Sequence, residues 1–199
     1  MPAQRKEDKA MPKTTPNTWL YADPHYGHAN IINYENRPFS SLEEMDAALI
    51  SSHNKAVKKT EKVFCLGDFA FYKKERIKEI VSRLNGYKVL ILGNHDRCHS
   101  VSWWKQHSGF DEVYPYPIIY DNFWIFSHEP LYVNGNMPYA NIYGHVHSNP
   151  QYLDFSEQTF CVSVERIGYA PRTFEEVKGK MKSYAEKGGQ HAINNPTAN

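Results

Sequence analysis

The chain has 199 residues, of which 41% are hydrophobic and 14% aromatic, enough for one domain with a sizeable core. Its 23 Lys and Arg residues nearly balance its 22 Asp and Glu residues, so no broad basic surface for nucleic acid is expected. The sequence shows neither a long apolar run nor a basic leader, which argues against membrane insertion and secretion. We therefore expect a cytoplasmic protein.

Composition also sets the expected domain boundaries. Residues 1–17 are polar and charged without periodicity and are predicted to form a flexible tail, as are residues 188–199. Residues 18–187 contain no linker, repeat or low-complexity block, so they are predicted to form a single domain.

Four helices are expected along the chain. A short one follows His25, over residues 29–32. The next begins at Ser41, which has a glutamate three residues later and so forms a capping box. A third has apolar residues at helical spacing over 77–84 and stops at an Asn-Gly pair. The last opens with a second capping box at Thr173.

Six apolar runs are predicted to be strands: 18–22, 62–66, 88–92, 123–127, 140–144 and 160–164. The early runs alternate with helices, which favours parallel pairing, whereas residues 114–128 indicate a hairpin turning at Asp121-Asn122. The expected architecture is α/β, with a mixed sheet or a two-sheet sandwich flanked by helices.

Polar residues follow the ends of five of these runs. In open α/β sheets, ligands bind beyond the carboxyl ends of the strands, and Asp, Asn and His are typical donors to a divalent metal. The five strand ends lead, in chain order, to Asp23-Pro24-His25, Gly67-Asp68, Gly93-Asn94-His95-Asp96, His128 and His145-Val146-His147.

Each of these patterns has an ordinary alternative when taken alone. Asp23 could cap the following helix, Gly67-Asp68 could be a simple turn, and His128 could be a structural histidine. Five such patterns, each at its own strand end, nevertheless predict one shared metal site. The i, i+2 spacing of the D-x-H and H-x-H pairs supports this, because such residues point the same way in extended chain.

The ordered set D-x-H, GD, GNHD, H and GHVH, over about residues 19–165, resembles the calcineurin-like metallophosphoesterase family. The resemblance implies a four-layer α/β/β/α sandwich of two mixed sheets flanked by helices, with two metal ions at the strand ends. It assigns Asp23, His25, Asp68 and His147 to one metal and Asp68, Asn94, His128 and His145 to the second, with Asp68 bridging. His95 matches the family's catalytic histidine, and Asp96 matches the carboxylate that orients it.

The segment from His25 to Asp46 looks like a small bacterial and phage branch of that family. Cys161 departs from this branch, because an asparagine is expected at that position. The three cysteines (Cys65, Cys98 and Cys161) are odd in number and lack C-x-x-C spacing, so they are predicted to be reduced and not to bind metal.

The predicted chemistry is hydrolysis of small phosphomono- or phosphodiesters, nucleotides among the candidates. Two divalent cations can clamp a phosphoryl group and activate a water as hydroxide, with His95 as general acid. Imidazole and carboxylate donors suit Mn, Fe, Zn or Ni better than Mg or Ca. His28, Arg37 and Arg97 are candidates to contact the substrate phosphate. The alternatives are a helix-start hydrogen bond for His28 and solvated or ion-paired arginines.

Two other functions compete with this prediction. One is a non-catalytic metal-binding scaffold of the same fold, and the other is a nuclease acting on single-stranded nucleic acid. The complete set of metal positions and the presence of His95 favour the enzyme, and the balanced charge disfavours a duplex nuclease. Trp103 and Trp104 are expected to pack in the core rather than stack on a nucleobase, and His53 is expected at the surface.

Overall fold

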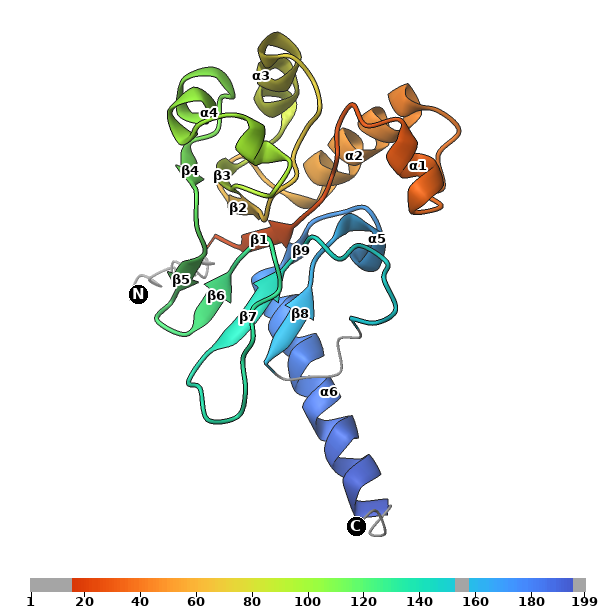
Figure 1. Ribbon diagram of the computed structural model, residues 1–199, viewed down its shortest axis with the longest axis vertical. Coiled ribbons are helices and arrows are strands. Elements are labelled where there is room, and N and C mark those ends of the chain that lie inside the picture. The colour runs from red at the N-terminus through yellow and green to blue at the C-terminus, as the bar shows by residue number, and fades with distance from the viewer. Residues whose placement is uncertain (1–15, 153–157, 195–199) are drawn as a thin grey trace, which may run out of the picture.

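The protein, seen here as a computed structural model that describes residues 16–152 and 158–194, contains two mixed β-sheets flanked by helices (Figure 1). The first sheet consists, in spatial order, of β4 (Glu112–Tyr114), β3 (Tyr87–Ile91), β2 (Lys62–Cys65), β1 (Thr18–Tyr21) and β9 (Arg172–Thr173). The second consists of β5 (Ile118–Tyr120), β6 (Trp124–Phe126), β7 (Ala140–Tyr143) and β8 (Thr159–Cys161).

Strand direction follows the predicted pattern. Strands β1 to β4 pair in parallel, while β9 is antiparallel to β1. In the second sheet, β5 and β6 form the predicted antiparallel hairpin and the remaining pairs are parallel. The hairpin loop has three residues, 121–123, because Tyr120 pairs with Trp124. Asp121 and Asn122 are the predicted turn residues, and both adopt a positive φ, of 50° and 56°, as the two central residues of a type I′ turn do. The α/β class with two mixed sheets is therefore confirmed.

The predicted helices are present, with Ser41 and Thr173 as N-terminal caps. The capping box at Thr173 is complete, whereas Glu44 accepts from the Ser40 amide rather than from that of Ser41. The Ser41 hydroxyl accepts a hydrogen bond from the Glu44 amide, and the Thr173 hydroxyl accepts one from the Glu176 amide, both at 3.1 Å. The helices are α1 (Asn30–Tyr34), α2 (Leu42–Ala56), α3 (Lys74–Arg83), α4 (Val101–His107), α5 (Val164–Ile167) and α6 (Phe174–Asn194), with a 3₁₀ turn at Asp96–Cys98.

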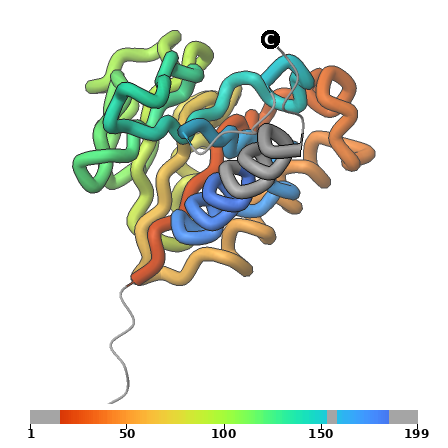
Figure 2. Tube along the Cα trace, turned by 90° about the horizontal axis from the view of Figure 1, so that it is seen from below, coloured from red at the N-terminus to blue at the C-terminus, as the bar shows by residue number. Residues whose placement is uncertain are grey.

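The helices cover the sheets on two sides. Figure 1 shows α1 to α4 gathered beyond the first sheet, and Figure 2 shows α6 lying alongside β1. Between the sheets, the ring of Phe64 on β2 contacts Phe126 on β6 and Tyr120 on β5, with centroids 5.1 and 5.5 Å apart. This apolar layer fixes the relative position of the strand ends.

Among the described residues, the elements α4, α5, β4 and β9 and the 3₁₀ turn were not predicted from the sequence. Helix α6 continues to Asn194, past Gly188, where the C-terminal tail was predicted to begin. Most of the predicted tail over residues 1–17 lies outside the described residues. Across the described part of the chain, no helix has both the length and the apolar composition required to cross a bilayer.

Candidate metal centre

The carboxyl ends of β1, β2, β3, β6 and β7 lie together and bring the predicted metal residues into two groups. Asp23, His25 and His147 form the first group, in which the candidate donor atoms all lie within 4.8 Å of one another. Asp68, His128 and His145 form the second under the same limit. Each group could hold a metal ion, and each contains three of the four residues that the family resemblance assigns to one metal.

Asp68 lies between these two groups. Its Oδ2 atom is 3.6 Å from His25 Nε2 in the first group and 3.3 Å from His128 Nε2 in the second. Its Oδ1 atom accepts a hydrogen bond from the His95 amide at 2.9 Å, which fixes the carboxylate plane. Burial by itself would raise the pKa of Asp68, but the neighbouring histidines His128 and His25 outweigh it and lower that pKa to about 2.

Asn94 joins the second group through its side-chain oxygen. Its Oδ1 atom lies 2.9 Å from His128 Nε2 and 3.0 Å from His145 Nδ1. His128 is held from behind, because its Nδ1–H donates to the Leu66 carbonyl oxygen at 2.8 Å. This hydrogen bond fixes the ring and leaves Nε2 turned toward the other donors, the arrangement typical of metal-binding histidines.

Two further observations on Asp23 and His25 indicate that these residues suit a divalent cation. Asp23 Oδ1 and His25 Nε2 are both buried without a hydrogen-bond partner, although buried polar atoms are almost always paired. Burial also raises the pKa of Asp23 to about 6 and lowers that of His25 to about 2. A metal ion bound there would satisfy both orphaned atoms and neutralise the buried carboxylate.

The backbone at these positions is strained. A positive φ is uncommon outside glycine and costs on the order of 1–3 kcal/mol, and such residues cluster at functional sites. Five of the predicted metal residues adopt it: Asp23 (58°), His25 (53°), Asp68 (52°), His145 (70°) and His147 (47°). The fold therefore holds these side chains in place at the expense of local stability.

Glycine is required where β2 and β3 end. Gly67 has a φ of 92°, and a Cβ there would collide with the His128 ring and the Gly93 backbone. A Cβ on Gly93 would in turn collide with the carboxylate and amide of Asp68. The absence of both side chains allows the two strand ends to approach closely enough to place Asp68 beside His128.

His95 lies at the surface of this centre. Its side chain is 49% exposed, and Nε2 is 4.0 Å from Asp68 Oδ2. The ring packs at centroid distances of 5.0 Å from Phe71 and 5.7 Å from His25. It is thus held beside the two groups while remaining accessible to solvent.

The prediction that Asp96 orients His95 is wrong. The Asp96 carboxylate is buried and accepts hydrogen bonds from the backbone amides of Asp68, Phe69 and Gly93, at 2.7, 3.0 and 2.9 Å. It therefore fixes the turns after β2 and β3 rather than an imidazole ring. A carboxylate that begins a 3₁₀ turn is well placed to collect amide donors from adjacent turns.

Arg37 is also corrected, since it does not face a substrate. It is 4% exposed and donates to the carbonyl oxygens of Asp23 and Pro24, both at 2.8 Å. Its guanidinium also binds Glu165 Oε1 at 2.6 and 2.9 Å. All of its donating groups are thereby directed into the protein.

Glu165 was not predicted from the sequence to be a residue of this site. The same Oε1 atom accepts a hydrogen bond from His147 Nδ1–H at 3.1 Å, which leaves Nε2 of His147 for a metal. Glu35, His147 and Glu165 form a third cluster of possible donors. Because Glu165 is already engaged by Arg37 and His147, we assign it to positioning His147. A signal was available, since Glu165 follows the run 160–164 as the other polar residues follow theirs.

The two remaining substrate candidates lie near the centre. His28 Nδ1 is 3.2 Å from His25 Nδ1, and its ring stacks on Phe71 at 4.4 Å. Arg97 forms a two-pronged ion pair with Glu129, at 2.8 and 3.2 Å. Arg97 would have to exchange this partner in order to bind a phosphate.

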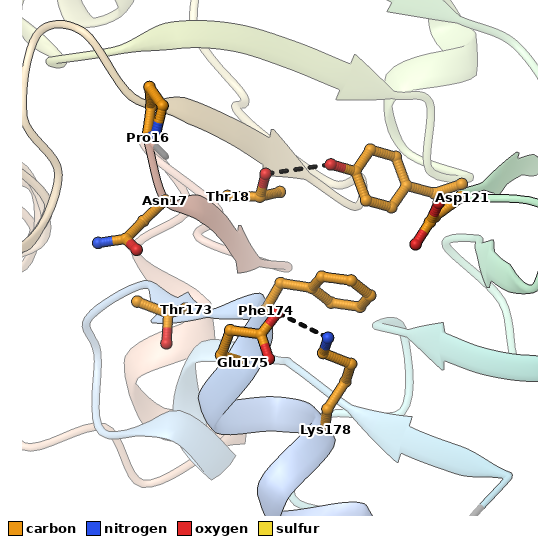
Figure 3. A pocket seen from close by; sticks show the side chains of 9 residues that line it. Pro16, Asn17, Thr18, Asp121, Thr173, Phe174, Glu175 and Lys178 are labelled. Carbon is orange, nitrogen blue, oxygen red and sulfur yellow. Dashed lines mark hydrogen bonds and ion pairs between the residues drawn. The ribbon is translucent and has the colours of Figure 1, made fainter. Parts of the chain in front are cut away.

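A hollow at the opposite end of β1 offers different chemistry. This cavity has a volume of about 500 Å³. Figure 3 shows the side chains that line it, among them Thr18, the first residue of the strand. The Thr18 hydroxyl is paired with the Tyr120 hydroxyl at 3.2 Å, and Lys178 is paired with Glu175 at 2.6 Å. The metal-binding chemistry of the described residues is thus concentrated at the carboxyl ends.

Comparison with known proteins places the chain in a family. No protein-family model matches it. A crystal structure of AQ665, a protein of unknown function from Aquifex aeolicus, shares its fold, with a TM-score of 0.65 and 24% identity over 83% of this chain and 99% of that one. The gene 66 protein of Mycobacterium phage L5 is 36% identical over 89 residues, 43% of this chain and 42% of that protein.

A longer alignment relates the chain to an archaeal protein. It is 31% identical over 174 residues to the uncharacterized protein MJ1445 of Methanocaldococcus jannaschii, covering 82% of this chain and 93% of that protein. The chain therefore belongs to the same family as MJ1445.

Proposed function

We propose that this protein is a phosphoric ester hydrolase that uses two divalent metal ions, built on the four-layer metallophosphoesterase fold. The observation that carries the proposal is the position of Asp68 Oδ2, which faces His25 Nε2 at 3.6 Å and His128 Nε2 at 3.3 Å. One carboxylate oxygen directed at both groups suits a shared ligand between two cations about 3.5–4 Å apart.

The residues divide between the two ions as the grouping suggests. Asp23, His25 and His147 would hold one ion, Asn94, His128 and His145 the other, and Asp68 would bridge them. The mixture of imidazole nitrogen and carboxylate or amide oxygen favours Mn, Fe, Zn or Ni over Mg or Ca.

When bound, such a pair of ions neutralises charge on the phosphoryl oxygens and lowers the pKa of a water molecule. The protein's own contribution is position and proton transfer. His95 is anchored by its amide to Asp68 and presents a half-exposed ring, so it can protonate the departing alkoxide of an ester. Leu66 and Glu165 hold His128 and His147 from behind through their Nδ1 atoms.

The proposal is tested by metal reconstitution of the full chain. Protein stripped with a chelator is assayed with Mn, Fe, Zn or Ni on an aryl phosphomonoester, an aryl phosphodiester, 2′,3′- and 3′,5′-cyclic nucleotides and single-stranded DNA. We expect turnover of at least one small ester only after metal is added, and its loss in Asp68→Ala. Glu79→Ala, which removes an exposed ion pair with Arg76 on α3, is the matched control and should retain activity.

Two results would overturn the proposal. Absence of turnover with every metal and ester would favour the non-catalytic scaffold. Cleavage of single-stranded DNA alone, with a steep dependence on salt, would favour the nuclease.

A further inference from the structure

Phe71 is a large apolar side chain exposed beside the candidate metal centre. It is 42% exposed, yet one side of its ring is packed on imidazoles. It stacks on His28 at a centroid distance of 4.4 Å and on His25 at 5.3 Å, and it lies 5.0 Å from His95. Phe71 therefore touches both a predicted metal residue and the proposed general acid while leaving part of its ring open to a ligand.

The same residue lines a hollow that extends away from the centre. This cavity has a volume of about 510 Å³ and is also lined by Lys73, Lys74, His99 and Trp103. Such a volume lies in the range of small-molecule sites, about 300–1,000 Å³, and far exceeds the space a phosphate requires. The cavity and the metal centre share Phe71 as a common wall.

The opposite part of the cavity is aromatic as well. Trp103, predicted to lie in the core, is only partly buried, whereas its neighbour Trp104 is fully buried. The Trp103 ring stacks on His99 at 3.7 Å, which holds it in one orientation. Phe71 is exposed and Trp103 is half-buried, so each ring keeps part of its surface accessible, and such aromatic surfaces bind planar rings at low entropic cost.

The charged residues that line the cavity are two lysines and one glutamate, Lys73, Lys74 and Glu75, which together give it a net positive charge. Lys73 and Lys74 are both exposed at the beginning of α3, and the Lys74 amine has a single acidic neighbour, Glu75, at 3.9 Å. Planar aromatic walls with adjacent lysines match a planar base linked to an anionic phosphate backbone. An alkyl phosphate would leave these surfaces unused.

We propose that this cavity binds the base of a nucleoside phosphoester, with Phe71 and Trp103 as stacking surfaces and the scissile phosphate at the metal centre. The inference rests on the proposed function, which it narrows to substrates that carry a nucleoside. Phe71 and Trp103 are thus specificity-determining residues, and the metal residues and His95 are common to all esters.

Two esters with one leaving group isolate the contribution of the base. The metal-loaded full chain is assayed on methyl p-nitrophenyl phosphate and on thymidine 5′-(p-nitrophenyl phosphate), and the ratio of their kcat/KM values is measured. We expect the wild-type ratio to favour the nucleoside ester by roughly 10-fold or more, since one aromatic–base stack contributes on that order. The ratio should fall toward unity in Phe71→Leu and in Trp103→Leu.

Use of a ratio separates specificity from catalysis. Phe71 contacts His95, so Phe71→Leu could slow both esters, but such an effect cancels between them. Trp103 lies on α4 and packs on His99, Trp104 and His107, so Trp103→Leu tests the cavity from the side away from the metals. Phe123→Leu is the matched control, since Phe123 is 39% exposed on the turn between β5 and β6.

Binding is measured independently of turnover. Saturation-transfer NMR on the metal-free full chain with thymidine 5′-monophosphate should show signals from the base protons, weakened in Phe71→Leu and Trp103→Leu and retained in Phe123→Leu. Turnover of both esters at equal kcat/KM would overturn the base site and leave the hydrolase intact. If the base signals weaken in the two variants and neither ester is cleaved, the site is supported and the hydrolase is overturned. If the base protons show no saturation transfer with the wild type, or show equally strong transfer with Phe71→Leu and Trp103→Leu, the base site is overturned whatever the turnover.

Discussion

The carboxylate of Glu165 joins His147 to Arg37: its Oε1 atom accepts the His147 Nδ1–H at 3.1 Å and binds the Arg37 guanidinium at 2.6 Å. Arg37 is fully enclosed and Glu165 nearly so. A buried carboxylate hydrogen-bonded to the far nitrogen of a metal-binding imidazole sets the tautomer and orientation of that ring. Burial raises the pKa of the Glu165 carboxyl, but the His147 hydrogen bond and the Arg37 charge outweigh it and lower that pKa below its usual value.

Glu165→Gln should therefore weaken metal binding without removing a ligand. We expect the dissociation constant of one metal ion to rise about 10- to 100-fold, the usual cost of losing such a supporting contact. Competition with a chromophoric chelator measures it. Glu79→Gln, which removes an exposed acid from its surface ion pair with Arg76, should leave it unchanged. Equal metal affinity of Glu165→Gln and wild type would contradict the role given to Glu165.

Asp96→Asn should lower both stability and metal content. The carboxylate accepts three backbone amide hydrogen bonds in the turns that carry Asp68 and Gly93. An amide in its place cannot accept all three, and a buried unpaired donor costs about 1–3 kcal/mol. Urea unfolding and elemental analysis measure the two effects.

The matched control for this variant is Asp111→Asn. Asp111 also accepts a backbone amide hydrogen bond, from Lys88 at 2.7 Å, but it does so at an exposed position. The metal content of Asp111→Asn should equal that of wild type. Normal stability and metal content in Asp96→Asn, combined with lowered turnover, would restore the view that Asp96 acts on His95.

The strand ends were predictable because each apolar run stops abruptly at a residue with a donor side chain. Asp68 and His128 were singled out because each follows an apolar run and ligands bind beyond the carboxyl ends of strands, whereas their assignment to particular metals came from the family resemblance. The helix caps at Ser41 and Thr173 were predictable for a similar reason, because each depends on two residues only three positions apart in the sequence.

The supporting residues were not predictable in the same way. Arg37 and Glu165 are 128 positions apart in sequence, and only the packed fold joins them. The aromatic wall of Phe71 depends on rings brought from several separate turns. Strands β4 and β9 have three and two residues, so they are too short to show the alternation of apolar and polar residues that predicts a strand.

His53 gives a prediction about pH. Expected at the surface, it is buried in α2, and its Nε2–H donates to the Asn85 carbonyl oxygen at 2.9 Å while Nδ1 has no partner. Burial lowers the pKa of His53 to about 4. In the unfolded chain the pKa is about 6.5, so between these values the unfolded state binds more protons than the folded state.

The contribution of His53 to stability is therefore complete above pH about 6.5 and decreases as the pH falls toward 4, by on the order of 3 kcal/mol in total. His53→Gln, which can still donate to Asn85, should show a shallower loss of stability across this window. Urea unfolding of the metal-free wild type and variant at several pH values measures the difference. Identical pH slopes would show that His53 does not titrate as described.

His95→Ala should separate metal binding from chemistry. The residue anchors to Asp68 through its backbone amide, which alanine retains, so metal content and fold should be unchanged. Loss of a general acid costs about 10²–10⁴-fold, and we expect that loss for an alkyl leaving group. An activated aryl leaving group departs without a proton and should be affected far less. An equal loss across leaving groups, or loss of a metal, would show that His95 is not the general acid.

We propose that Asp68 joins two metal sites into one catalytic centre. The most direct measurement is the initial rate of hydrolysis of an aryl phosphodiester as Mn²⁺ is added stepwise to the metal-free full chain. Because both groups of donors flank the same Asp68 oxygen, the rate should rise to a plateau at two equivalents per chain and stay near zero in Asp68→Ala. A plateau at one equivalent, or a rate in Asp68→Ala equal to that of wild type, would contradict the account.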